Sequence, residues 1–482
     1  MFTAKGHIEV VDTEYSIRTA LSIVDNGSLL IDPPASLNEA AVDYFRSISN
    51  ITNQKEAEGK IYSAYGIGLS IIFIPFVLFS KTLGWLTGIE LRLILDFVLS
   101  FYNIPFAILG LYFFQKITLL LGASTLRSSL ITVFLGLGTC YWKYTVTDFS
   151  EISQGCIILM VLYTMLKKDK YMWYKLSFFY SFLVLLKLTY FIFLPLLLVY
   201  FITENLRQSP TNTLNNFLKS SSFLLPTCIF IAVTNAIRFH SPFKTGYGNN
   251  IKFSMDFFFR DWFDYLLSLD RGILPFNPIL FISLISLFFI TKRYIKSFTI
   301  IGAIVLIWYL TMCFWVSLQG GFCWGNRLLV PIIPLIIMPL VFLDFNKIYS
   351  KLLLGLTFIG SIIIQFAGSF TKIHEVILIK LEIHELSNQI PQSQLWLGFK
   401  LFLHKIKSSN AEYLASNFGI DSSHLINLSS YNTFHGFNLW AVHLLNHFDL
   451  KRYSHFIGIA VLSITIGLCF SLFRILFSNT KT

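Results

Sequence analysis

Long apolar runs recur along most of this 482-residue chain and are separated by short polar loops. A run of about 20 apolar residues is long enough to cross a bilayer as a helix. Only 13% of the residues are charged, whereas a soluble domain carries about 25%. The pattern therefore predicts an all-α polytopic membrane protein with about 11 transmembrane helices. The predicted spans are roughly 89–114, 125–142, 152–166, 172–186, 190–203, 220–238, 273–290, 298–317, 328–344, 352–369 and 455–476.

Basic residues mark one side of these predicted spans. They gather in every second loop, as at Lys116, at Lys167 to Lys170 and at Lys292 with Arg293. By the positive-inside rule these loops are cytoplasmic. The outer loops are then 1–88, 143–151, 187–189, 239–272, 318–327 and 370–454. The formal net charge of +11 is spread among loops without a basic tract, so membrane orientation explains it and no nucleic-acid partner is expected.

The topology depends on the apolar run 62–80, which Gly66, Gly68 and Pro75 interrupt. We expect an interfacial juxtamembrane helix there, because a span would move the preceding residues to the cytoplasm. Residue 1 then lies outside, which would require a further span before it. The predicted domains are a first extracytoplasmic loop with juxtamembrane helices and an acidic motif (1–88), a transmembrane core (89–369), a small extracytoplasmic domain (370–454), and a final transmembrane helix with a cytoplasmic tail (455–482).

The acidic motif in the first outer loop contains Asp12 and Glu14. Residues 13–25 have the periodicity of an amphipathic helix, with Asp12 at the position of an N-cap. Capping alone would account for Asp12, and an i,i+4 ion pair with Arg18 would account for Glu14. If the helix begins at Thr13, one acid can point into a site, and Asp12 is the better candidate.

A second acidic cluster, Asp148 and Glu151, lies in the next outer loop before an apolar run. Asp148 as N-cap with Glu151 three residues later fits a capping box. A role in orienting a substrate is the other interpretation.

Three cations on the same predicted side are candidates for binding an anion: Lys187, Arg271 and Arg327. Lys187 lies between two very apolar runs, where a buried charge costs about 2.5–3.5 kcal/mol unless it reaches the surface or an anion. Arginine suits phosphate oxygens, although an arginine at a membrane boundary is usually interfacial. The convergence of the three predicts a phosphate site beside Asp12.

Several other site types are not expected. His7, His240 and His374 lack zinc-binding spacing, so no structural metal is predicted. Most of the six cysteines lie inside apolar runs and form neither a disulfide framework nor a metal motif. Arg92 and Asp96, one turn apart in a predicted span, are interpreted as a mutually neutralising pair.

Taken together, these segments resemble the GT-C class of integral-membrane glycosyltransferases, which includes the aminoarabinose transferases and protein mannosyltransferases. The resemblance covers nearly the whole chain. It is carried by Asp12-Thr13-Glu14, by the segment from Gly59 to Gly66, by Asp148, and by the segments 238–248, 270–278 and 324–334. Two features depart from the class. The usual first span is absent, and Thr13 separates the two acids.

The resemblance implies a GT-C-like bundle in the plasma (inner) membrane with its active site facing outward. It implies inverting transfer of a hexose or pentose from a polyprenyl-phosphate donor to a lipid, glycan or protein acceptor, and it leaves a divalent cation open. Asp12 would be the general base with Glu14 as helper, and Asp148 and Glu151 would orient the acceptor or sugar. Lys187, Arg271 and Arg327 would bind the donor phosphate. Four residues are assigned to substrate loops: Lys60, Tyr62, Tyr65 and Tyr247.

Two other functions fit parts of the pattern. A secondary transporter would have inverted repeats and ionisable residues near the membrane midplane. A polymerase or ligase of lipid-linked glycans would have a long, strongly basic outer loop. The chain shows no internal repeat, and loop 239–272 has few cations, so the transferase is preferred.

Overall fold

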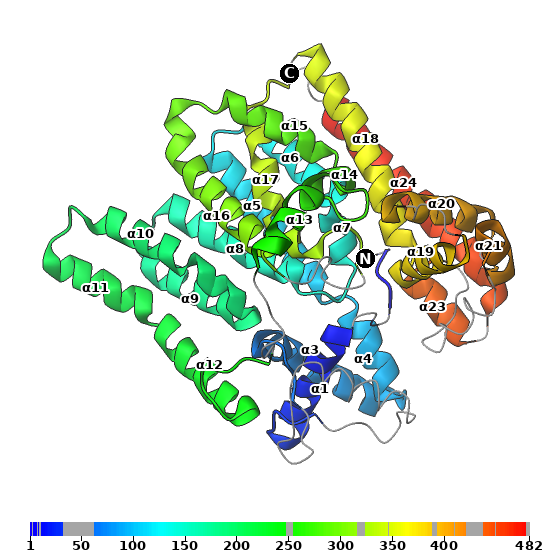
Figure 1. The fold of residues 1–482 in the computed structure, drawn as a ribbon, viewed down its shortest axis with the longest axis horizontal. Coiled ribbons are helices and arrows are strands. Elements are labelled where there is room, and N and C mark those ends of the chain that lie inside the picture. The colour runs from blue at the N-terminus through cyan, green and yellow to red at the C-terminus, as the bar shows by residue number, and fades with distance from the viewer. Residues whose placement is uncertain are drawn as a thin grey trace.

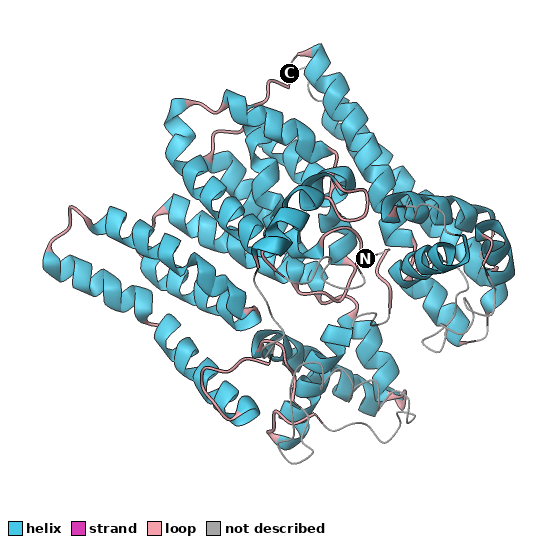
Figure 2. Ribbon diagram, viewed as in Figure 1, coloured by secondary structure: helices cyan, strands magenta, loops and turns pink. Residues whose placement is uncertain are grey.

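The computed structural model describes most of the chain. The described residues are 1–482 except 2, 7, 9–10, 32–61, 247–253, 316–322, 346, 388–392, 409, 421–436, 449 and 479–482. In this part of the chain the regular elements are helices (Figure 2). The prediction of an all-helical protein is confirmed.

Seven helical segments among the described residues are long and apolar enough to cross a membrane. They are Ile67–Thr87, Leu91–Leu120, Leu188–Asn205, Pro210–Phe239, Lys292–Cys313, Ile348–Phe370 and Ser454–Leu472. Shorter apolar helices lie at Thr125–Gly138, Met172–Leu186, Ile279–Phe289 and Arg327–Phe342. The chain is therefore an integral multi-pass membrane protein. How many of these segments cross the bilayer, and which face is outer, stay predictions.

The elements of the first half follow the predicted runs closely. They are α1 (Val11–Asn26), α3 (Ile67–Thr87), α4 (Leu91–Leu99), α5 (Asn103–Leu120), α6 (Thr125–Gly138), α7 (Cys140–Thr145), α8 (Glu151–Lys167), α9 (Met172–Leu186), η1 (Leu188–Phe193), α10 (Leu194–Asn205), α11 (Pro210–Ser221) and α12 (Leu224–Phe239). Most residues of α8 are buried, because α5 and α9 both pack against it. This helix is the interior of the bundle.

The second half contains shorter pieces between long helices. They are α13 (Met255–Leu267), α14 (Ile273–Phe276), α15 (Ile279–Ser286), η3 (Leu287–Phe289), η4 (Lys292–Tyr294), α16 (Ile295–Cys313), η5 (Arg327–Ile332), α17 (Ile333–Ile337), η6 (Met338–Phe342), α18 (Ile348–Phe370), α19 (Ile373–Ser387), α20 (Gln394–Lys407), α21 (Ala411–Phe418), α23 (Trp440–His447), η8 (Lys451–Tyr453) and α24 (Ser454–Ser478). In Figure 1, α19, α20, α21 and α23 form a group at one end of the molecule. The predicted domain 370–454 covers these four helices.

Helices α1, α3 and α4 form a second group below the bundle in Figure 1. The glycines that interrupt the run before α3 allow a close approach to the end of α9. A Cβ on Gly66 would lie 2.8 Å from the carbonyl oxygen of Leu185, and one on Gly68 would lie 2.5 Å from the carbonyl carbon of Leu185. Only glycine fits such contacts. The approach brings Tyr65, just before α3, to Lys187, just after α9, and both line one pocket.

Candidate functional site

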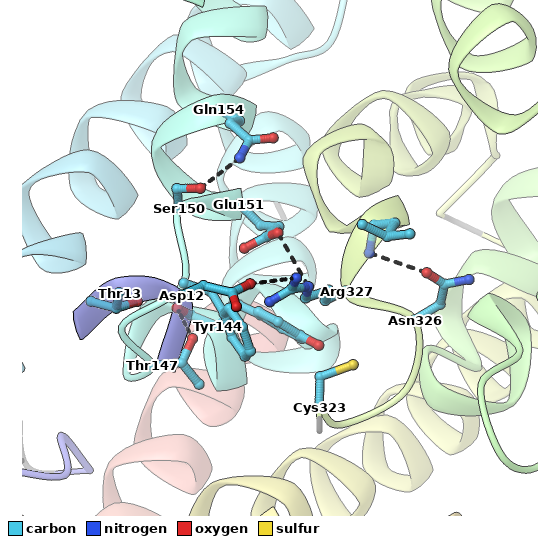
Figure 3. Close-up of polar contacts among 12 residues, drawn as sticks. Asp12, Thr13, Tyr144, Thr147, Ser150, Glu151, Gln154, Cys323, Asn326 and Arg327 are labelled. Atoms are coloured by element: carbon cyan, nitrogen blue, oxygen red, sulfur yellow. Dashed lines mark hydrogen bonds and ion pairs between the residues drawn. The ribbon is translucent and has the colours of Figure 1, made fainter. Parts of the chain in front are cut away.

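The carboxylate of Asp12 is the centre of a polar cluster (Figure 3). One oxygen, Oδ1, accepts a hydrogen bond of 2.7 Å from the Tyr65 hydroxyl, and the other, Oδ2, accepts one of 2.9 Å from Arg327. The side chain keeps 35% of its surface exposed. Asp12 lies in the first turn of α1, which begins at Val11. The alternative that it is the N-cap residue is therefore wrong, and its carboxylate is free to make contacts outside its own helix.

Arg327 connects the two acidic motifs. It is the first residue of η5, whose start is capped by the Asn326 side chain accepting from the backbone N–H of Leu328 at 3.1 Å. The Arg327 Nε lies 3.8 Å from a carboxylate oxygen of Glu151, and the guanidinium stacks over the Phe149 ring at 4.4 Å. One arginine thus faces two carboxylates from helices far apart in the sequence. Figure 3 shows Asp12 and Glu151 converging on it.

The loop before α8 is held by long-range hydrogen bonds. The Thr13 hydroxyl donates to the carbonyl oxygen of Asp148 at 2.8 Å, and the Tyr102 hydroxyl donates to that of Phe149 at 2.7 Å. The N-cap residue of α8 is Ser150 and no side chain caps the helix. The capping-box interpretation of Asp148 and Glu151 is therefore wrong. The tertiary bonds fix the loop and leave the Glu151 carboxylate facing Arg327.

Glu14 is placed differently from Asp12. Its two oxygens accept a bidentate pair of 2.7 Å hydrogen bonds from Arg92, and Arg18 donates to it at 2.8 Å. Burial alone would raise the pKa of Glu14, but the hydrogen bonds and charges of Arg92 and Arg18 hold that pKa below its usual value. The predicted pair with Arg18 is confirmed. The predicted pair of Arg92 with Asp96 is also present, at 2.9 Å. Arg92 thus binds Glu14 and Asp96 at the same time.

Lys187 lies close enough to the cluster for its charge to respond to it. Burial lowers the pKa of the Lys187 ammonium to about 8, although the charges of Glu151 and Asp12 raise it and that of Arg327 lowers it further. The ammonium lies 5.8 Å from the ring centre of Trp308. Together with Tyr65 and Arg238, Lys187 lines a small pocket. Arg327 contacts Asp12 and Glu151, and Lys187 lies near enough for the charges of both acids to affect its pKa; that the two cations bind a phosphate stays a prediction.

The third predicted cation, Arg271, has its described contacts with other acids. Its guanidinium donates to Asp264 at 2.7 Å and lies 3.6 Å from Asp261, both on α13. The sequence grouped it with Lys187 and Arg327 by loop alone, whereas in the structure it pairs with acids of α13. Its role in binding a phosphate stays a prediction.

The four predicted substrate-loop residues fall into two classes. Lys60 and Tyr247 lie outside the described residues. Tyr62 forms an isolated antiparallel bridge with Leu30, and Tyr65 binds Asp12 as given above. The assignment of Tyr65 to the site region agrees with its geometry, while its role stays a prediction.

Arg238 is a component of the site region that the residue-level reasoning missed. Its Nη1 donates to the carbonyl oxygens of Ser63 at 3.1 Å and Tyr65 at 2.8 Å, and its Nη2 donates to Asn235 at 3.0 Å. The arginine thereby fixes the backbone that presents Tyr65 to Asp12. Its place at the start of the segment 238–248 was the only signal available in the sequence.

Comparisons with known proteins give one match. No protein-family model matches the chain, and no curated protein matches its sequence. Among solved structures the chain is similar to ArnT from Cupriavidus metallidurans, crystallised with bound undecaprenyl phosphate. The similarity covers 95% of this chain and 72% of that chain at 11% identity, with a TM-score of 0.47. It is a likeness of helical architecture.

The described residues contain no group of three or more His, Cys, Asp or Glu side chains that could hold a metal ion. The prediction that no structural metal is present stays untested.

Proposed function

We propose that this protein is a GT-C-type glycosyltransferase that moves a sugar from a polyprenyl-phosphate donor to an acceptor hydroxyl on the outer face. One observation carries the proposal: Arg327 contacts both Asp12 and Glu151, and Lys187, which lines a pocket together with Tyr65, lies near enough for the charges of both acids to affect its pKa. A carboxylate next to two cations matches the charges that such a transfer develops.

The acceptor hydroxyl loses its proton to Asp12 as its oxygen bonds to the anomeric carbon of the sugar. The bond from that carbon to the phosphate oxygen breaks at the same time, and its electron pair leaves with the lipid phosphate. Attack from the face opposite the phosphate inverts the configuration. Lys187 and Arg327 stabilise the leaving phosphate, and Arg327 also orients the Asp12 carboxylate.

Asp12 is a better base than Glu14 for a structural reason. Glu14 has both oxygens occupied by Arg92 and a lowered pKa, so it accepts a proton poorly. Asp12 keeps part of its surface open to a substrate. Glu14 is accordingly a structural anchor for α1, and Glu151 holds Arg327 from the other side. Asp148 stays a proposed orienting residue through its buried position beside Thr13.

The proposal is tested with purified protein in proteoliposomes. Undecaprenyl-phosphate hexoses and pentoses, radiolabelled in the sugar, are supplied with a bacterial membrane extract as the acceptor source, and loss of label from the lipid donor is measured. We expect Asp12→Asn to lower the transfer rate about 10²- to 10⁴-fold, because that is the usual contribution of a general base.

Asp25→Asn is the matched control, because Asp25 lies on the same helix but faces outward toward Lys81. It should transfer at the wild-type rate. Wild-type-like transfer by a correctly inserted Asp12→Asn protein would remove Asp12 as the base. A wild-type protein that transfers none of the sugars would count against the proposed function itself.

A further inference from the structure

The start of α20, in the C-terminal group of helices, is bonded directly to the loop that delivers Arg327. Gln394 is the first residue of α20 and is 5% exposed. Its Nε2 donates to the carbonyl oxygen of Cys323 at 2.7 Å, and its Oε1 accepts from the backbone N–H of Gly325 at 3.1 Å. The nitrogen and the oxygen of this one side-chain amide therefore both bond to the backbone of a loop segment that ends two residues before Arg327.

The same loop has little other freedom. The Tyr144 hydroxyl donates to the carbonyl oxygen of Trp324 at 3.0 Å. The Trp324 ring packs where Gly368 of α18 and Gly398 of α20 leave no space for a Cβ. Gly325 has a φ of +64°, which favours glycine. The position of Arg327 is therefore set by a loop that contacts α18 and α20 on one side and Tyr144 on the other.

A second connection reinforces the position of Gln394. Its backbone N–H donates to the Asp270 carboxylate at 2.7 Å, and the same carboxylate accepts from Lys380 of α19 at 2.6 Å. The backbone N–H of Leu395 donates to the carbonyl oxygen of Leu269 at 3.1 Å. The N-terminal end of α20 is thus fixed before its glutamine reaches the loop.

We propose that Gln394 is a positioning residue for the transfer reaction, which holds the Cys323–Gly325 backbone so that Arg327 faces Asp12 and Glu151. The inference rests on the proposed function and extends it, because it makes the C-terminal helices part of the active arrangement. Gln394 touches no reacting group and acts through Arg327.

Two variants separate the amide's role from its volume. Gln394→Ala removes both hydrogen bonds, while Gln394→Glu keeps the shape but replaces the donor facing the Cys323 carbonyl oxygen with a second acceptor. We expect each to lower kcat about tenfold or more and to change the donor KM less than threefold, because a buried polar group left without its partner is costly and displaces the loop. Gln394→Asn, which retains the amide, should recover part of the rate.

A merely structural role is distinguished by a double-variant cycle. In an Arg327→Lys background, Gln394→Ala should lower the rate less than twofold further, since both changes disable the same group. Gln115→Ala is the control: Gln115 donates to the Ser129 hydroxyl at 3.0 Å, away from the loop. The rate of the Gln115→Ala, Arg327→Lys double variant should therefore be lowered by the product of the two single factors. If Gln394→Ala lowered the rate by the same factor in the Arg327→Lys background as in the wild type, the proposal would be overturned.

A chemical measurement tests the loop without any sugar transfer. Cys323 and Cys140 are each 3% exposed, so N-ethylmaleimide should modify both slowly in the wild type, with the adducts located by mass spectrometry. In Gln394→Ala we expect labelling of Cys323 to rise at least fivefold while that of Cys140 stays unchanged. Unchanged labelling of Cys323 would show that the loop is held without Gln394 and would overturn the inference even if the protein transferred no sugar.

Discussion

At the scale of single residues, two carboxylates two positions apart on α1 have opposite environments. Asp12 faces Tyr65 and Arg327 with part of its surface open, whereas Glu14 is enclosed by two arginines. A helix turns residues two apart to different sides, so local geometry alone separates the two acids. What it cannot provide is the identity of their partners, which come from distant segments.

Lys187 gives a pH prediction at this scale. Its pKa is lowered to about 8 in the protein, chiefly by burial, against about 10.4 for an ordinary lysine. A cation that binds the donor phosphate must be protonated, so the binding form predominates at pH values well below 8 and is lost as the pH rises through that value. We expect kcat/KM for the donor to fall about tenfold per pH unit above pH 8, because this ratio reports the free enzyme.

Lys187→Arg should shift that decline beyond the accessible pH range, because an arginine stays charged. Lys168→Arg is the control, since Lys168 pairs with Glu204 at the other end of α8, and it should leave the profile unchanged. A profile of the Lys187→Arg protein that still declines at pH 8 would assign the titration to another group.

At the scale of elements, the contact between α1 and α4 rests on the bidentate pair of Glu14 and Arg92. Arg92→Gln should lower the free energy of unfolding by about 2 kcal/mol, because it leaves a mostly buried carboxylate with one partner, while partial exposure of Arg92 reduces the cost. Arg18→Gln leaves the bidentate pair intact and should cost below about 1 kcal/mol. Thermal unfolding of both variants in the same detergent measures the difference. Equal losses would contradict the dominant role assigned to Arg92.

The sequence predicted the elements better than the contacts between them. Apolar runs and loop charges are local signals, and α1, α8, α9 and α18 follow them. Gly66 and Gly68 indicated only an interruption, because their function depends on the α9 backbone that approaches them.

The same reason explains which parts of the site were predicted. Asp12, Lys187 and Arg327 could be grouped from loop positions, because each lies in or beside a loop assigned to the outer face. Arg271 was grouped by the same rule, yet α13 provided closer carboxylates. The pairing of Arg92 with Glu14 and the bridge from Gln394 join segments far apart in sequence, and a single sequence holds no record of such distances.

At the scale of the whole molecule, the group of α19, α20, α21 and α23 contains an ion pair with almost no exposure to solvent. The Lys405 ammonium lies 2.6 Å from the Glu375 carboxylate, and the two side chains are 0% and 1% exposed. A buried pair of this kind is weak evidence for net stability, but the loss of one partner leaves a buried charge unpaired. The pair joins α19 to α20, and α20 carries Gln394.

Lys405→Met should therefore lower the free energy of unfolding by about 3–5 kcal/mol, whereas Lys405→Met combined with Glu375→Leu should recover most of that loss, because two apolar side chains can replace a buried pair at little cost. If α20 positions Arg327 through Gln394, the single variant should also lose transfer activity and gain Cys323 labelling, and the double variant should regain both wild-type properties. Thermal unfolding, transfer and labelling are compared on the same preparations. A single variant that loses stability yet keeps wild-type transfer and labelling would separate the C-terminal helices from the site and leave the ion pair as a local feature of the fold.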